Sequence, residues 1–162
     1  CSVIAGIMKR ANPDVNLVSA PFIAKERGIQ ISTTNQDKSG AFEGYIKVTI
    51  STDVRERSVA GTVFSDGKPR FIQIKGINID AEIGTHMLYT TNKDVPGVIG
   101  TLGKIMGSND VNIANFTLGR AQEGGEAIAL LYVDHPVPSF VLKDLDDTGV
   151  FQQIKPLEFD VS

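Results

Sequence analysis

Cysteine and histidine are scarce in this sequence of 162 residues. It contains one cysteine, Cys1, and two histidines, His86 and His135. A single thiol cannot close a disulfide within the chain, which fits a reducing, cytoplasmic compartment. So few thiols and imidazoles exclude a zinc site of the Cys/His type, and we expect no metal site.

Long apolar runs and an excess of positive charge are also missing. No apolar segment approaches the roughly 20 residues that a membrane-spanning helix needs, so we expect no membrane partner. The formal net charge of −3 at pH 7 offers no electrostatic attraction to nucleic acid. The first residue is not Met, and the opening CSVIAGIM lacks the basic start of a signal peptide. We therefore expect a fragment of a longer protein.

Motifs for catalysis and nucleotide binding are absent from the sequence. It has no Gly-x-Gly-x-x-Gly motif of the dinucleotide-binding kind. Residues 97–104 resemble a phosphate-binding loop, but their glycine spacing is one residue too long and Ile105 replaces Ser or Thr. His86 falls in a strand candidate, and nothing places a nucleophile beside it. We expect neither catalytic residues nor a bound cofactor in this chain.

The sequence has an ordinary globular composition, with 41% hydrophobic and 22% charged residues. Its first half predicts a helix over 2–10 and a second helix that begins after Asp14 or Asn16, contains Pro21 and ends at Gly28. A polar loop is expected over 34–43, and the dipeptide Asp66-Gly67 favours a tight hairpin turn. Runs rich in β-branched residues predict strands over 29–33, 44–51, 56–64 and 70–75.

The second half of the sequence follows a different pattern. It predicts, in order, a strand over 86–91, a helix over 96–106, strands over 111–118 and 126–133, a helix over about 139–147 and a strand over 150–159. This β-α-β-β-α-β order is the ferredoxin-like arrangement. The predicted fold class is α+β, with a helix-plus-antiparallel-sheet domain over 1–81 and a ferredoxin-like domain over 82–162.

The joint between the first strand and helix of the second domain reads NKDVPG and begins at Asn92. In one interpretation it is a turn, in which Asp94 caps the helix and Pro96-Gly97 forms its first turn. In the other it is a binding site, because the start of a helix attracts a carboxylate while Asp94 and Asn92 accept hydrogen bonds from an ammonium group. Asn112 is expected across the same end of the domain, as part of that site or as a turn residue.

The motif NKDVPGVIGTLGKIMGSNDVNIANFTLGR resembles the ACT domain of the D-3-phosphoglycerate dehydrogenase family. The segments NLVSAPFIAKERGI and GTVFSDGKPRFIQIKGINID resemble the allosteric substrate-binding, or intervening, domain of its long form. The resemblance covers nearly the whole chain. It implies the C-terminal regulatory region of an NAD-dependent oxidoreductase of L-serine biosynthesis, whose NAD-binding and catalytic parts lie outside this sequence.

The resemblance also implies a ligand and an assembly. ACT domains of this family bind L-serine as a feedback inhibitor at the interface of a homodimer that pairs edge to edge, and the full-length enzyme is a dimer or a tetramer. The apolar, β-prone run over 111–118 independently favours pairing of a sheet edge. The implied effector-binding residues are Asn92, Asp94, Pro96, Gly97 and, from across the interface, Asn112, together with backbone N–H groups from Val95 to Val98.

The intervening domain of the family is proposed to bind a substrate or another anion. The candidate residues in this sequence are Lys68, Arg70 and Lys75, although solvated strand charges are the commoner interpretation of such residues. Glu82 follows them and weakens the case for an anion site.

Two further functions remain open at the level of the sequence. A bacterial iron–sulfur L-serine dehydratase uses a similar pair of regulatory domains, and clustered cysteines elsewhere in the full-length protein would favour it. The third hypothesis is a free-standing amino-acid sensor, for which a start codon close to residue 1 would be the supporting observation.

Overall fold

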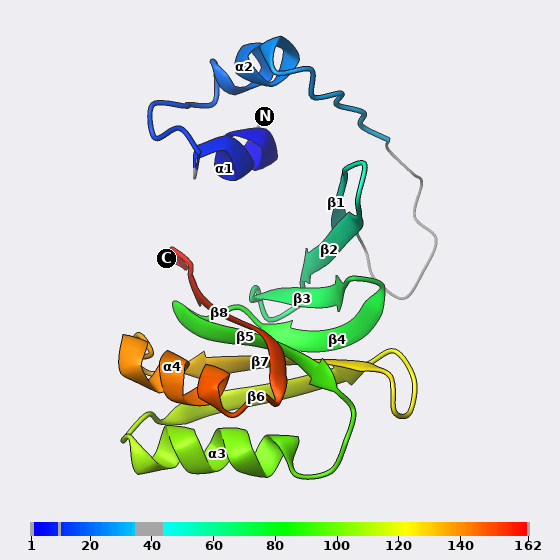
Figure 1. Ribbon diagram of the computed structural model, residues 1–162. Coiled ribbons are helices and arrows are strands. Elements are labelled where there is room, and N and C mark those ends of the chain that lie inside the picture. The colour runs from blue at the N-terminus through cyan, green and yellow to red at the C-terminus, as the bar shows by residue number, and fades with distance from the viewer. Residues whose placement is uncertain (1, 10, 35–43, 162) are drawn as a thin grey trace. The chain divides into compact units, whose positions relative to one another are not determined.

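The computed structural model describes residues 2–9, 11–34 and 44–161. Its chain forms two compact units, residues 1–43 and residues 44–162 (Figure 1). Among the described residues, no helix is long and apolar enough to cross a membrane. The same residues contain no group of three or more His, Cys, Asp or Glu side chains placed to hold a metal ion.

The first unit contains two short helices, α1 (Ser2–Lys9) and α2 (Ala20–Glu26). Asn16 positions the second helix, because its Oδ1 accepts hydrogen bonds from the N–H groups of Val18 and Ser19, at 2.9 Å each. Both predicted helices are confirmed. The strand predicted over 29–33 is wrong, since the described residues offer it no partner strand. The loop predicted over 34–43 lies almost entirely outside the described residues.

The second unit begins with a four-stranded antiparallel sheet in the order β1-β2-β3-β4. The hairpin predicted at Asp66-Gly67 is present, and Gly67 has the positive φ of 77° that this turn requires. Strand β4 was not predicted, because the turn before it is Lys75-Gly76, in which a lysine adopts a φ of 52°. The strands are β1 (Ile46–Ser51), β2 (Glu56–Val63), β3 (Pro69–Ile74) and β4 (Ile77–Glu82).

A second antiparallel sheet, in the order β6-β7-β5-β8, forms the rest of this unit. The predicted β-α-β-β-α-β order and the α+β fold class are confirmed, and the arrangement is of the ferredoxin-like, ACT type. The strands are β5 (His86–Lys93), β6 (Ile113–Arg120), β7 (Glu126–Val133) and β8 (Phe151–Glu158), and the helices are α3 (Val98–Ser108) and α4 (Ser139–Asp147).

The two faces of the second sheet pack against different layers. One face carries Leu88 and Leu131, which pack against α3 and α4 through residues such as Leu102 and Leu145. The opposite face carries Met87 and Leu130, which join Ala81 and Phe71 of the first sheet in a separate apolar cluster. In Figure 1 the helices accordingly lie on one side of this sheet and β3 and β4 on the other.

Close packing of the two sheets has a local cause at Gly119. A Cβ atom there would lie 2.4 Å from Ile79 Cγ2 and 2.9 Å from the carbonyl oxygen of Asn78. Only glycine lets β4 cross β6 at this distance. The predicted domain boundary at residues 81 and 82 falls between the two sheets, where β4 ends. That division remains a prediction, because the two sheets belong to one compact unit.

Candidate functional site

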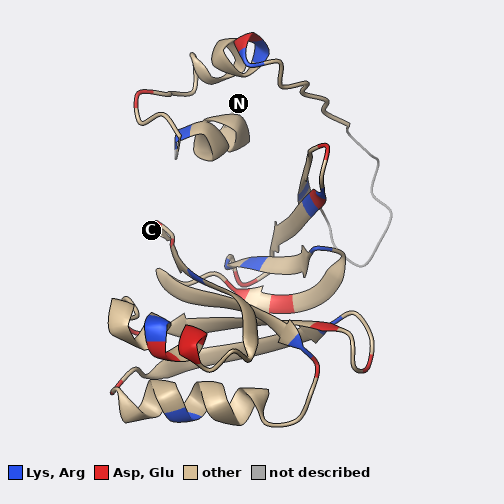
Figure 2. Cartoon of the chain, viewed as in Figure 1, with Lys and Arg blue, Asp and Glu red and all other residues tan. Residues whose placement is uncertain are grey.

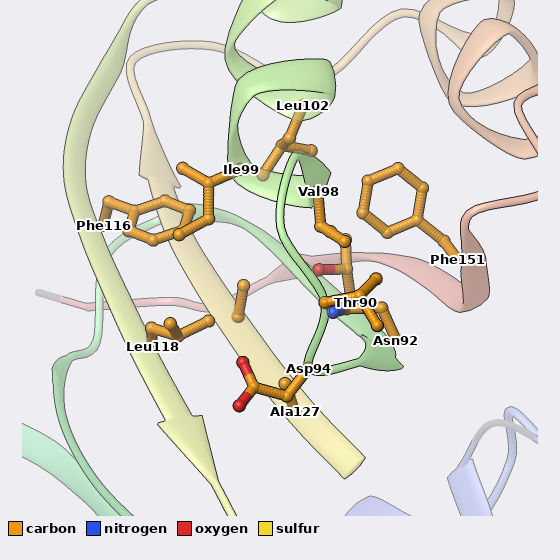
Figure 3. Close-up of a pocket in the computed structure, with 12 residues that line it drawn as sticks. Thr90, Asn92, Asp94, Val98, Ile99, Leu102, Phe116, Leu118, Ala127 and Phe151 are labelled. Carbon is orange, nitrogen blue, oxygen red and sulfur yellow. The ribbon is translucent and has the colours of Figure 1, made fainter. Parts of the chain in front are cut away.

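A small pocket of about 40 Å³ lies beside the start of α3, over the part of the second sheet where β7 runs between β5 and β6. Figure 3 shows side chains from β5, β6 and the helix converging on it. Its polar residues are Thr90, Asn92 and Asp94, all from β5 and the turn after it. The remaining lining residues are apolar: Val95, Val98, Ile99, Leu102, Phe116, Leu118, Ala127, Ala129 and Phe151.

The alternation of β5 directs two polar side chains toward this pocket. Alternate residues of a strand face one side, so Thr90 and Asn92 share the helix-covered face with Leu88. Thr90 is 0% exposed and Asn92 is 3% exposed. Asn92 Nδ2 donates a hydrogen bond of 2.6 Å to the carbonyl oxygen of Lys93. Asn92 was predicted to lie in the turn after the strand and is instead a buried residue of β5 at the pocket wall, while its role in binding stays a prediction.

Asp94 does not cap the helix, so the capping interpretation is wrong. The cap position of α3 is Gly97, with a φ of 93° and no side-chain cap. The Asp94 carboxylate turns instead toward the connection between β6 and β7, where its Oδ2 accepts hydrogen bonds from Arg120 Nη1 at 2.8 Å and from the N–H of Gly124 at 3.4 Å. The N–H of Asp94 donates to the carbonyl oxygen of Gly125 at 2.8 Å.

The ion pair with Arg120 stabilises the charged form of Asp94. The Arg120 hydrogen bond, with a smaller contribution from the N–H of Gly124, holds the pKa of the Asp94 carboxyl below its usual value. Arg120 is the last residue of β6 and was not predicted as a site residue. β5 and β6 run parallel, so the residues at their ends lie at the same edge of the sheet. Arg120 ends β6 and Asp94 follows β5, and this correspondence is the signal that could have identified Arg120.

The chain makes a tight turn before α3, and Pro96 belongs to this turn and not to the helix. The N–H of Val95 donates to the carbonyl oxygen of Lys93 at 2.9 Å, and Gly97 takes a backbone conformation that side chains disfavour. The helix begins at Val98, two residues later than predicted, and Val98 lines the pocket. The first N–H groups of any helix lack partners within the helix, and here they start at the pocket.

Asn112 lies at the opposite end of the sheet, so its predicted position within one chain is wrong. Its neighbour Ile113 pairs with Val133, which in turn pairs with His86 at the beginning of β5. Asn112 Nδ2 donates a hydrogen bond of 2.7 Å to Asp134 Oδ2. Because β6 runs parallel to β5, the residue that precedes β6 is a full strand length away from Asp94.

The comparisons with known proteins are consistent with this architecture. Residues 1–75 match the family model described as the D-3-phosphoglycerate dehydrogenase intervening domain. A D-3-phosphoglycerate dehydrogenase of Bacillus subtilis is 33% identical over 97% of this chain. One of Methanocaldococcus jannaschii is 33% identical over 82% of the chain, and a chloroplastic one of Arabidopsis thaliana is 27% identical over 93%.

The chain belongs to the D-3-phosphoglycerate dehydrogenase family. It corresponds to the C-terminal part of these dehydrogenases and spans 25% to 30% of the three relatives named above. All three relatives named above are D-3-phosphoglycerate dehydrogenases, which favours the dehydrogenase interpretation over the iron–sulfur L-serine dehydratase.

In the segment that matches the intervening domain, the three basic residues predicted as an anion site already have carboxylate partners. Lys68 Nζ lies 2.8 Å from Glu82 Oε1, and Lys75 Nζ lies 2.5 Å from Glu126 Oε1.

The guanidinium of Arg70 pairs with Asp66 at 3.0 Å and Asp80 at 3.2 Å, and it lies over the ring of Phe64. Figure 2 shows acidic positions on β4 next to basic ones on β3. The anion site stays a prediction.

Proposed function

We propose that this chain is the regulatory region of a D-3-phosphoglycerate dehydrogenase and binds L-serine, the product of the pathway, as a feedback inhibitor. The observation that carries the proposal is the pocket of this chain, which lies beside the start of α3 and has Asp94 at its edge. The NAD-dependent oxidation would take place in catalytic and NAD-binding regions outside this chain.

The chemistry of the pocket suits a small zwitterion. The carboxylate of Asp94 is ionised at neutral pH, since its pKa lies below even the usual 3.8, and it can accept a hydrogen bond from a ligand ammonium group. The N–H groups at the start of α3 and the positive end of the helix dipole suit the ligand carboxylate. Asn92 contributes its amide oxygen at the wall between these two positions.

A second copy of the chain would complete the site. β6 is an edge strand of its sheet, and Val95, Ile99 and Leu118 leave 52%, 52% and 42% of their surface exposed near it. An unpaired edge with an apolar border favours association. Antiparallel pairing of two β6 strands about a twofold axis sets the start of one strand beside the end of the other. Asn112 of the second copy would then lie near Arg120 and Asp94 of the first.

Regulation would follow from a shift between conformations. L-serine bound between two copies favours the arrangement of the regulatory regions in which the ligand contacts both. The same binding energy then disfavours the arrangement needed for turnover in the distant catalytic region.

Calorimetric titration with L-serine tests the proposed function. We expect saturable binding by the 162-residue chain, with glycine and D-serine binding more weakly. Asp94→Ala is expected to abolish the binding, because it removes the acceptor for the ammonium group. Asp144→Ala, which alters an exposed carboxylate of α4 outside the pocket, should bind as the unmodified chain does. The proposal would be refuted if millimolar L-serine produced no heat of binding and no thermal stabilisation of the chain.

A further inference from the structure

Two adjacent threonines of β5 are buried with their hydroxyl groups unpaired. Thr90 and Thr91 are both 0% exposed. Neither Oγ1 atom has a hydrogen-bond partner among the residues that the structure describes. Nearly all buried hydroxyl groups in folded proteins are paired, because an unpaired one loses its contact with water without compensation. Each of these hydroxyl groups therefore needs a physical explanation.

The two threonines point to opposite faces of the sheet. Thr91 shares its face with Met87 and Tyr89, which pack toward the first sheet. Thr90 shares its face with Asn92 and lines the pocket at the start of α3 (Figure 3). Of the two residues, only Thr90 lines the pocket, so its hydroxyl group is the one that lies next to the proposed ligand site.

Among the described residues, Thr90 is also the polar residue of the pocket whose side chain has no hydrogen-bond partner. Asn92 already uses its amide nitrogen on the carbonyl oxygen of Lys93, and Asp94 uses one carboxylate oxygen on Arg120. The walls that surround Thr90 are apolar and come from α3, β6 and β8: Val98, Leu102, Phe116 and Phe151. In such surroundings a hydrogen bond to Thr90 is worth more than the same bond in water.

We infer that Thr90 hydrogen-bonds the side-chain hydroxyl of the bound amino acid and so makes the site prefer L-serine to L-alanine. This inference rests on the proposed function. Thr90 and Asn92 are two strand residues apart, which is about 6.6–6.8 Å. The ammonium group has three N–H donors, so it can bond to Asp94 and to the amide oxygen of Asn92 together. One hydrogen bond between Thr90 and the serine hydroxyl and one between the ammonium group and Asn92, about 2.8 Å each, are joined by the three bonds between the nitrogen and the hydroxyl oxygen of serine and can span that separation.

The discrimination has a defined physical origin. L-alanine lacks the hydroxyl group and would leave Thr90 buried and unpaired, whereas L-serine would pair it. One neutral hydrogen bond of this kind corresponds to about a two- to tenfold difference in affinity. Replacing Thr90 by valine keeps the shape of the side chain and removes the hydroxyl, so the preference should disappear.

Calorimetric titrations of the full chain with L-serine and L-alanine test this assignment. Thr90→Val should weaken L-serine binding about two- to tenfold, leave L-alanine binding unchanged and abolish the preference. Thr91→Val is the matched control, because it removes an equally buried and unpaired hydroxyl from the other face of the sheet. Thr90→Ser, which retains a hydroxyl, should retain the preference. Thermal melts of each variant report whether the fold is intact.

The outcomes separate the assignment from the proposed function. Binding of L-serine by the unmodified chain, with a preference that survives in Thr90→Val, overturns the role of Thr90 and leaves the proposed function standing. Loss of the preference in Thr91→Val or Thr90→Ser as well would also overturn the assignment, because the effect would then be one of packing. Failure of the unmodified chain to bind either amino acid refutes both.

Discussion

The contacts of Asp94 decide whether the segment NKDVPG is a helix-capping turn. Its hydrogen-bond partners, Arg120 and Gly124, lie 26 and 30 residues away in the sequence. A capping carboxylate would satisfy the helix that follows it. Asp94 instead joins the end of β5 to the connection between β6 and β7. The contact fixes the carboxylate at the edge of the pocket, where a ligand can reach it.

The ion pair between Asp94 and Arg120 predicts how Asp94 titrates. Arg120→Gln should raise the pKa of the Asp94 carboxyl toward the unperturbed value of 3.8, because the strongest cause of its lowering is removed. Carboxyl-carbon NMR titration measures this pKa directly. Arg55→Gln is the control, since Arg55 is exposed and is not a cause of the Asp94 shift. An Asp94 pKa that is the same in Arg120→Gln would contradict the pair.

The sign of the linked stability follows from the same shift. The pKa of Asp94 is lower in the folded chain than in the unfolded chain, so the ion pair stabilises the fold at pH values above 3.8. This contribution is lost as the pH falls through the lower, folded-state pKa. Arg120→Gln should therefore weaken the fold at neutral pH and reduce the dependence of its stability on pH in the acid range.

At the scale of elements, the turn into α3 determines where the pocket begins. Gly97 stands at the cap position with a φ of 93° and has no side chain to donate or accept a hydrogen bond. The helix starts at Val98 beside the pocket, and no N–H group of its first turn donates a hydrogen bond to the side chain of Asp94. The start of the helix thus depends on the backbone conformation of a glycine, whereas most helices begin at a residue whose side chain accepts a hydrogen bond.

A pair of glycine substitutions tests the importance of this turn. Gly97→Ala should lower the free energy of unfolding by about 1–2 kcal/mol, because alanine disfavours a positive φ. Gly100→Ala, one turn into the same helix, should raise it by about 0.5–1 kcal/mol, since a Cβ there meets nothing within 4 Å. Urea denaturation measures both. Equal effects of the two substitutions would show that the backbone conformation of Gly97 is not required.

The element boundaries show which local signals were sufficient. β7 was predicted at its observed bounds, because a run of apolar residues ended by Gly124-Gly125 and Asp134 is unambiguous. β4 was missed, because Lys75-Gly76 is not a typical hairpin dipeptide. The lysine tolerates its positive φ in a tertiary setting in which its Nζ pairs with Glu126 of the second sheet. That partner is 51 residues away and is invisible to any local pattern.

At the scale of the whole molecule, the site proposed here needs two copies of the chain. Within one copy, Asp94 and Asn112 lie at opposite ends of the sheet. A twofold pairing of β6 edges would bring Asp94 of each copy to Asn112 of the other, and the assembly would contain two equivalent sites.

Mixing two variants tests the shared site. Asp94→Ala and Asn112→Ala should each fail to bind L-serine, because every site in either homodimer lacks one contact. After subunit exchange, a mixed dimer should regain one intact site, since the unmodified Asp94 of one chain meets the unmodified Asn112 of the other. Calorimetry on the mixture measures the regained binding, and light scattering confirms the dimer. A mixture that binds no better than its components would argue against a site shared between copies.

The sequence by itself determined the α+β class, the order of elements in the second half and the family, because periodicity, turn residues and motifs are local properties of the chain. The tertiary structure alone decided the partner of Asp94, the burial of Thr90 and the end of the sheet at which Asn112 lies. Each of these depends on which strands become neighbours and in which direction they run. Strand order results from the packing of distant segments into a common core, and no short stretch of sequence contains that information.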